Sequence, residues 1–225
     1  MNISIFEVTG PVMIGPSSSH TAGAARLSRM ARNIAGKPFT HVSFGLHGSF
    51  AKTYKGHGTD KALVAGALGL FEDDDRLSYA FDLATRQGLS YVFYETELEG
   101  FHENTVKMTF DLEDGSHSEI IGSSIGGGQI VLRRIDGFDV ELSGRLPTLL
   151  IRQKDERGLV SEVSRILAAN GINIGIMKLS RTARGDTAFC VIETDDAISP
   201  GVAKSIEQVT GVLSVGLIPS PAQEG

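Results

Sequence analysis

The sequence predicts an α+β protein with two domains, the first over residues 1–144 and the second over residues 148–220. Helical and strand-like patterns alternate along the whole chain, and a series of strand-like segments ends in Gly144-Arg145-Leu146-Pro147, where a new alternation begins. The chain has 225 residues, of which 41% are apolar and 21% charged, so it can bury a sizeable core. We therefore expect folded domains rather than a disordered chain.

The first domain combines helices and strands in an irregular order. A helix is predicted over residues 21–35, with hydroxyl residues ahead of it that can cap its first turn. A second helix is expected from a cap at Thr59 and Asp60, and a third is expected to end at Gly88. Strands are predicted over residues 42–46, 91–97 and 106–112, after the Asp114-Gly115 turn, and over residues 129–135 and 138–143.

The second domain has the more regular pattern. A strand at residues 148–153 precedes a helix that ends at Asn170-Gly171, and two strands follow. Pro200 opens a second helix, and residues 212–218 form a last strand. The order βαββαβ in about 70 residues predicts a ferredoxin-like split βαβ fold, with an antiparallel sheet covered by helices on one face.

Composition limits the function classes. Lys plus Arg total 21 and Asp plus Glu total 27, and the net charge of −6 argues against nucleic acid or an anionic membrane as partner. The apolar runs are shorter than the roughly 20 residues of a membrane span, and the N-terminus does not resemble a signal peptide. We therefore expect a cytoplasmic protein. Cys190 is the single cysteine, so any metal bound by several thiolates must be held by another chain.

The first candidate site is the polar loop Gly15-Pro16-Ser17-Ser18-Ser19-His20-Thr21, which opens directly onto the first predicted helix. Free backbone N–H groups and the helix dipole favour an anion at such a place, and the hydroxyls add further donors. An elaborate helix cap is the alternative, although a single serine would suffice for that. The residue types leave anion binding and capping equally open.

The second candidate is His57, which lies between two glycines just before the second predicted helix. Glycines allow a ligand to approach the backbone closely, and an imidazole titrates near neutral pH, as a general base requires. A surface histidine without a function is the alternative. The segments at residues 101–104 and 123–128 are the third and fourth candidates, with simple turns as the alternative, and the sequence lacks the patterns of a serine hydrolase or a three-histidine zinc site.

The second domain resembles an ACT domain. The similarity lies in residues 155–160 before the first helix, in residues 171–174 and in residues 188–193. ACT domains typically pair through sheet edges or helices and bind small amino acids at the interface, so the resemblance implies self-association and an amino-acid ligand. A plain dimerisation module is the alternative, because Arg157 stands where the binding loop often has proline.

Four strings in one order resemble the β subunit of the two-subunit, iron-sulfur-dependent L-serine dehydratases: GPSSSHTAGAARLSRMAR at 15–32, HGSFAKTYKGHGTDKA at 47–62, HEN at 102–104 and SIGGGQI at 124–130. The resemblance implies a lyase that converts L-serine to pyruvate and ammonia and is active only with its α subunit. That subunit would hold a [4Fe-4S] cluster, which replaces pyridoxal phosphate, and this chain would hold no metal.

The resemblance also implies roles for individual residues. His57 is expected to be the catalytic base or proton relay, and His20 to share either role. The substrate and its carboxylate are expected to bind at Ser17, Ser18, Ser19 and Thr21. The first domain is also similar to the allosteric substrate-binding domain of some phosphoglycerate dehydrogenases, which implies effector contacts at His102 and Asn104.

Two other functions fit the same residues. A purely regulatory subunit would bind amino acids and leave all chemistry to another chain. A phosphate-binding metabolic enzyme would use the loop at residues 15–21.

Overall fold

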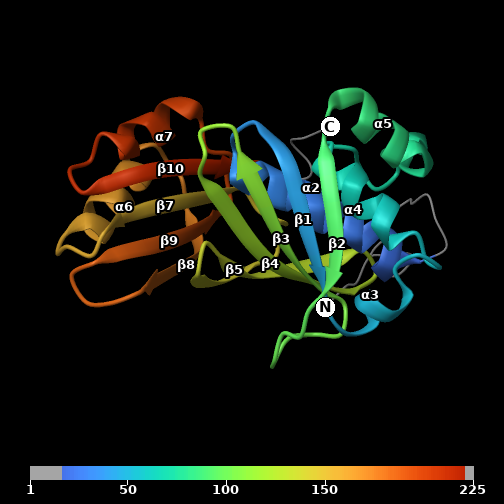
Figure 1. Cartoon of the computed structure of the whole chain (residues 1–225). Helices are drawn as coiled ribbons and strands as arrows, with labels where there is room; N and C mark the ends of the chain where they lie inside the picture. Colours follow the sequence, from blue (N-terminus) through green and yellow to red (C-terminus); the bar gives the residue numbers. More distant parts are fainter. Residues whose placement is uncertain (1–16, 221–225) are drawn as a thin grey trace, which may run out of the picture. The chain divides into compact units, whose positions relative to one another are not determined.

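The computed structural model describes residues 17–220, so Gly15 and Pro16 of the polar loop lie outside the described residues. The chain divides into two compact units, Met1–Gly137 and Phe138–Gly225, and each unit is a mixture of helices and strands (Figure 1). The predicted α+β class is thereby confirmed. The predicted domain limits, 1–144 and 148–220, stay a prediction.

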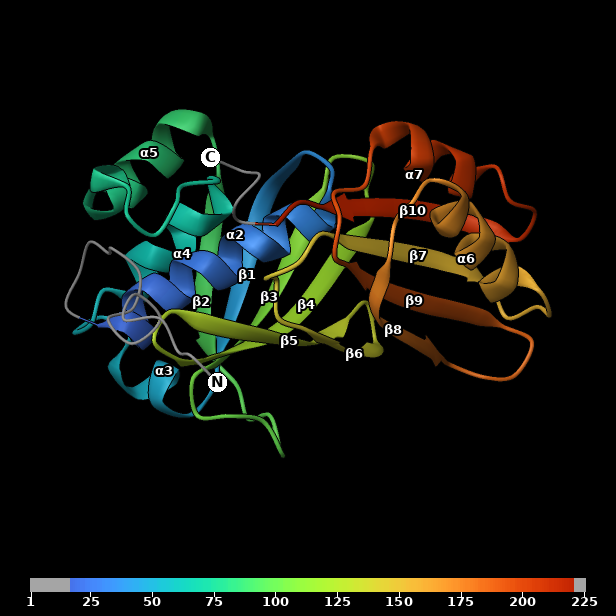
Figure 2. The same cartoon turned by 180° about the vertical axis from the view of Figure 1, so that it is seen from behind.

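Helices of the first unit cover one face of a sheet. A π-helical turn runs directly into the helix α2, and a 3-10 turn leads into the helix α5. The helical segments are the π-turn Ser18–Ala22, α2 Gly23–Ala35, α3 Gly48–Thr53, α4 Thr59–Ala67, the 3-10 turn Asp75–Tyr79 and α5 Ala80–Gln87. Figure 2 shows α2 and α4 lying across the sheet, and α2 packs on the strands β3, β4 and β5.

The sheet has the strand order β2-β1-β3-β4-β5-β6. Its strands are β1 Phe39–Leu46, β2 Ser90–Glu95, β3 Thr105–Leu112, β4 His117–Gly126, β5 Gln129–Ile135 and β6 Phe138–Leu142. β1 and β2 are parallel, whereas β3 pairs antiparallel with both β1 and β4. Alternate side chains of β3, among them Val106, Met108 and Phe110, are fully buried, as expected for a strand with one face toward the core.

The second unit confirms the order βαββαβ. After β6, its elements are β7 Thr148–Lys154, α6 Leu159–Ala169, β8 Ile174–Arg181, β9 Thr187–Thr194, α7 Pro200–Glu207 and β10 Val212–Ile218. The strands form one antiparallel sheet in the order β10-β7-β9-β8. Apolar side chains of α6 and α7 pack with those of β7 and β9 around the single cysteine, Cys190.

Three local details differ from the sequence-based expectations. The first helix begins three residues earlier than predicted, because the π-turn extends it back to Ser18. Gly58, at a φ of 68°, is the N-cap of α4, and the expected caps Thr59 and Asp60 already lie inside the helix. The six-residue helix α3 has no counterpart in the prediction.

Candidate functional site

The serine-rich loop forms the start of a continuous helix, with Ser17 as its N-cap. Ser17 is extended, at φ −144° and ψ 128°, and its side-chain oxygen accepts a hydrogen bond of 3.1 Å from the backbone N–H of His20. The Ser17 carbonyl also accepts the N–H groups of Thr21 and Ala22, at 3.0 and 3.3 Å. The capping interpretation of this loop is therefore confirmed for one of its three serines.

The remaining hydroxyls have different surroundings. The Oγ of Ser19 lies 3.4 Å from that of Ser17 and 3.2 Å from Nδ1 of His20. The half-buried Ser18 has no hydrogen bond from its hydroxyl to any residue between 17 and 220. The N–H groups of His20, Thr21 and Ala22 already donate to Ser17, so the donors that this end offers to an anion are the hydroxyls and the N–H groups of Ser18 and Ser19.

The structure brings His20 and His57 together. Their ring centroids lie 4.8 Å apart with an angle of 42° between the planes, and the rings of Phe50 and His20 form a T-shaped pair with 5.3 Å between centroids. Thr21 fixes the second loop, because its hydroxyl donates to the carbonyl of His57 at 3.1 Å. The two predicted histidines therefore share one site, built at the starts of α2 and α4.

The two imidazoles have unequal environments. Burial lowers the pKa of His20, and the neighbouring His57 lowers this pKa further because two positive rings repel each other. His57 is exposed, and its ring makes no hydrogen bond within the described part of the chain. The two rings therefore differ in burial and in hydrogen bonding: both nitrogens of His20 have partners, whereas those of His57 have none within residues 17–220.

Ser49 also lies in this site, although its place in the sequence predicts no role for it. Its Oγ lies 3.2 Å from Nε2 of His20. Ser49 is in the short helix α3, whose start is fastened to the loop before β3: the N–H of Ser49 donates to the carbonyl of Glu103 at 2.8 Å. The motif containing Ser49 was visible in the sequence, but its place beside His20 depends on a helix too short to show a period.

His102 and Asn104 lie on either side of this fastening point. Nδ1 of His102 accepts the N–H of Asn104 at 3.1 Å, and the carbonyl of Asn104 accepts the N–H of Ser124 at 2.9 Å. The side-chain oxygen of Asn104 is buried without a partner in residues 17–220, and so is the hydroxyl of Ser124, which lies against Gly23. The segment is thus joined to the histidine site through Glu103.

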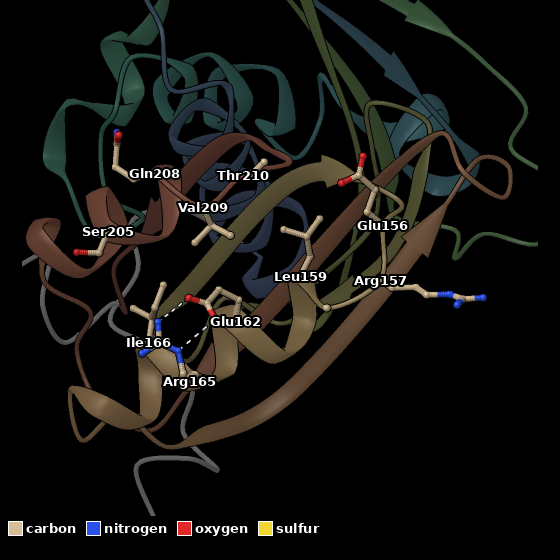
Figure 3. A pocket seen from close by; sticks show the side chains of 11 residues that line it. Glu156, Arg157, Leu159, Glu162, Arg165, Ile166, Ser205, Gln208, Val209 and Thr210 are labelled. Atoms are coloured by element: carbon tan, nitrogen blue, oxygen red, sulfur yellow. Dashed lines mark hydrogen bonds and ion pairs between the residues drawn. The ribbon is translucent and has the colours of Figure 1, made fainter.

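A cleft lies beside these residues, and a separate pocket lies in the second unit. The cleft of about 590 Å³ in the first unit adjoins α3, and its lining includes His47, Lys52 and four acidic side chains, Glu95, Glu97, Glu99 and Glu103. In the second unit, a pocket of about 720 Å³ lies between α6 and the end of α7 (Figure 3). Arg157 extends away from the other side chains that line this pocket, whereas Arg165 is paired with Glu162.

Between residues 17 and 220, no group of three or more His, Cys, Asp or Glu side chains is arranged to hold a metal ion. None of the helices in this range has the length and apolar character of a membrane span.

Comparison with known proteins gives two family matches. Residues 4–79 match the family described as serine dehydratase beta chain, and residues 147–211 match the ACT domain family. The beta chain of L-serine dehydratase from Peptoniphilus asaccharolyticus is 41% identical over 90% of this chain and 92% of its own length. The probable beta chain of L-serine dehydratase from Bacillus subtilis is 39% identical over 94% of this chain and 96% of its own. D-3-phosphoglycerate dehydrogenase of Bacillus subtilis is 27% identical over 88% of this chain and 38% of its own length.

Proposed function

Because the chain belongs to the family of L-serine dehydratase beta chains, we propose that it supplies part of the active site of this lyase and works only together with an α subunit. The proposed reaction converts L-serine to pyruvate and ammonia in the cytoplasm. The observation that carries the proposal is the His20–His57 pair, which lies at the serine-rich start of a helix. This arrangement offers anion-binding donors and a proton acceptor side by side.

In this proposal the substrate carboxylate binds at the start of the helix. The hydroxyls of Ser17, Ser18 and Ser19 and the first backbone N–H groups donate to its oxygens, with Thr21 holding the adjoining loop. Hydrogen bonds to a charged group contribute roughly 1.5–3 kcal/mol each when well formed. This binding site would orient the α-proton of the substrate.

His57 is the proposed base. Its exposed ring has no hydrogen bond within residues 17–220, so a nitrogen is available to take the α-proton. Burial and the neighbouring ring lower the pKa of His20, so the folded chain disfavours a proton on this second imidazole.

The described residues of this chain do not fit an iron-sulfur cluster. They contain no metal-binding group of side chains, and the single cysteine is buried in the core of the second unit. We therefore assign a [4Fe-4S] cluster to the α subunit, where it would supply a Lewis acid in place of pyridoxal phosphate.

The ACT unit and the His102 segment are assigned to regulation. We propose that Asn104, whose side-chain oxygen is buried without a partner in the described range, contacts an effector together with His102. Self-association is assigned to β8, the edge strand of the second sheet, where the hydroxyl of Ser180 already donates to the carbonyl of Asp139 in β6. β8 leaves Ile176 and Leu179 exposed by 50% and 43%, which is a large apolar exposure for an edge strand.

The test uses the complex of this chain with its α subunit. His57→Ala should lower kcat at least a hundredfold, because a positioned base contributes about 10²–10⁴ to the rate. The absorbance spectrum of the cluster should stay unchanged. His117→Ala is the matched control: His117 is an exposed histidine of the same unit, paired with Asp111 on the sheet, and its loss should leave kcat unaltered.

Two outcomes would contradict the proposal. Normal kcat in the His57→Ala complex, with altered cooperativity toward serine, would assign the chain to the purely regulatory class. Deamination of serine by the purified chain alone, free of metal and of its partner, would show that no α subunit is needed.

A further inference from the structure

The imidazole of His20 is held between two serine hydroxyls. Ser19 Oγ lies 3.2 Å from Nδ1, and Ser49 Oγ lies 3.2 Å from Nε2. A neutral imidazole has one donor and one acceptor nitrogen, and a hydroxyl can serve either of them. Both nitrogens of His20 are therefore occupied by partners from two different helical segments.

Ser49 is itself held firmly. Its N–H donates to the Glu103 carbonyl at 2.8 Å, and its carbonyl accepts the hydroxyl of Thr53 at 2.8 Å. The preceding Gly48, at a φ of 58°, lies so close to Glu103 that a Cβ there would come within 2.6 Å of the Glu103 carbonyl oxygen. The Ser49 hydroxyl is thus presented to His20 from a fixed backbone, and the His20 ring is its hydrogen-bond partner.

We propose that Ser49 is a positioning residue, which fixes the orientation of the His20 ring and, through that ring, the place of His57. The proposal rests on the proposed function, because it gives His57 the role of base. Nε2 of His20 would lose its partner without Ser49, and the ring could then turn about its bond to Cβ. The His57 ring, whose centroid lies 4.8 Å from that of the His20 ring, would then lose its packing contact.

The chain offers a matched control for this interaction. On the sheet of the same unit, the hydroxyl of Ser90 lies 2.8 Å from Nδ1 of His41, which is a second serine–histidine pair outside the candidate site. Ser90→Ala removes the same chemical contact from another imidazole. Ser49→Thr is the conservative variant, because it keeps the hydroxyl.

The first measurement is made on the full chain without a partner, by long-range ¹H–¹⁵N NMR of the histidine rings at neutral pH. In Ser49→Ala the Nε2 resonance of His20 should move toward the position of a solvent-averaged imidazole. In Ser49→Thr it should stay near the wild-type position, and in Ser90→Ala the resonances of His41 should move instead. Unchanged His20 resonances in a folded Ser49→Ala chain would overturn the proposal.

The second measurement is kinetic and uses the complex with the α subunit. Losing one hydrogen bond of this kind should lower kcat about tenfold in Ser49→Ala, with serine KM within about twofold of wild type. Ser49→Thr should recover most of the loss, and Ser90→Ala should show none. A kcat within twofold of wild type, or an equal loss in the Ala and Thr variants, would overturn the positioning role. Because the NMR result needs no turnover, failure of the proposed lyase activity would be seen separately.

Discussion

His20 and His57 come from the starts of two different helices, yet their ring centroids lie 4.8 Å apart. At this distance two protonated imidazoles would repel each other strongly, and His20 is also partly removed from solvent. Adding a proton to His20 is therefore disfavoured in the folded chain.

The lowered pKa of His20 predicts that the stability of the fold depends on pH. The pKa of His20 is lowered in the folded chain, mainly by burial, so the unfolded chain binds this proton more readily. The free energy of unfolding should therefore fall as the pH decreases through the ordinary histidine pKa of about 6.5 toward the lower folded value. Urea unfolding between about pH 5 and pH 8 should show a smaller fall in His20→Gln than in wild type. Equal falls in both chains would contradict the assigned direction of the pKa shift.

Gly66 is predicted to tolerate no side chain. A Cβ on this residue of α4 would lie 2.2 Å from the Ala25 carbonyl oxygen and 2.8 Å from the Arg29 nitrogen, which are both backbone atoms of α2. Gly66→Ala should therefore lower the free energy of unfolding by about 1–3 kcal/mol or more, as overpacking does. The control is Gly201→Ala in the exposed part of α7, where the nearest atom is 3.8 Å away. Chemical denaturation that found the two variants equally stable would refute this helix contact.

Cys190 should be almost unreactive in the folded chain. The thiol lies in the core of the second unit, and burial raises its pKa to about 11, so very little thiolate forms near neutral pH. Labelling with an aromatic disulfide reagent should be much slower in buffer than in denaturant, and its rate should report the opening of this unit. Rapid labelling of the native chain would show that the core is more accessible than its packing indicates.

Glu193 places a carboxyl group in a buried position of β9. Burial raises its pKa, and its hydrogen-bond partner is the hydroxyl of Ser143 at 3.4 Å. The unfolded carboxyl loses its proton at lower pH than the folded one, so this group destabilises the fold as the pH rises above about 4. Glu193→Gln should therefore raise the thermal midpoint at pH 7 and change it less at pH 4. Glu207→Gln, at an exposed position of α7, should alter neither midpoint.

The second unit was predictable because its elements are long and regular. β9 extends over eight residues, of which all but Thr187 are buried, and α7 begins with Ser199 as N-cap and Pro200 at its first position, as helix statistics favour. The short helix α3 was missed, because six residues are too few to show a helical period. The start of α4 was misplaced, because the cap is the backbone geometry of Gly58 and involves no polar side chain.

The candidate site was predictable residue by residue, but its assembly was not. His20 and His57 each stand out by their neighbours in the sequence. Their contact depends on how α2 and α4 pack, which no local pattern contains. Ser49 reaches His20 only because Glu103, more than fifty positions along the chain, holds the start of α3.

The close approach of α2 and α4 at Gly66 also determines where the two loops ahead of these helices lie relative to each other. Each histidine stands at the beginning of one helix. The distance between the two rings is therefore set by how closely the backbones of α2 and α4 pack. A survey of random substitutions for lost turnover would accordingly report small interior residues that touch neither imidazole. Substitutions at such positions would lower turnover, although these residues act only by keeping the two helices at the right distance.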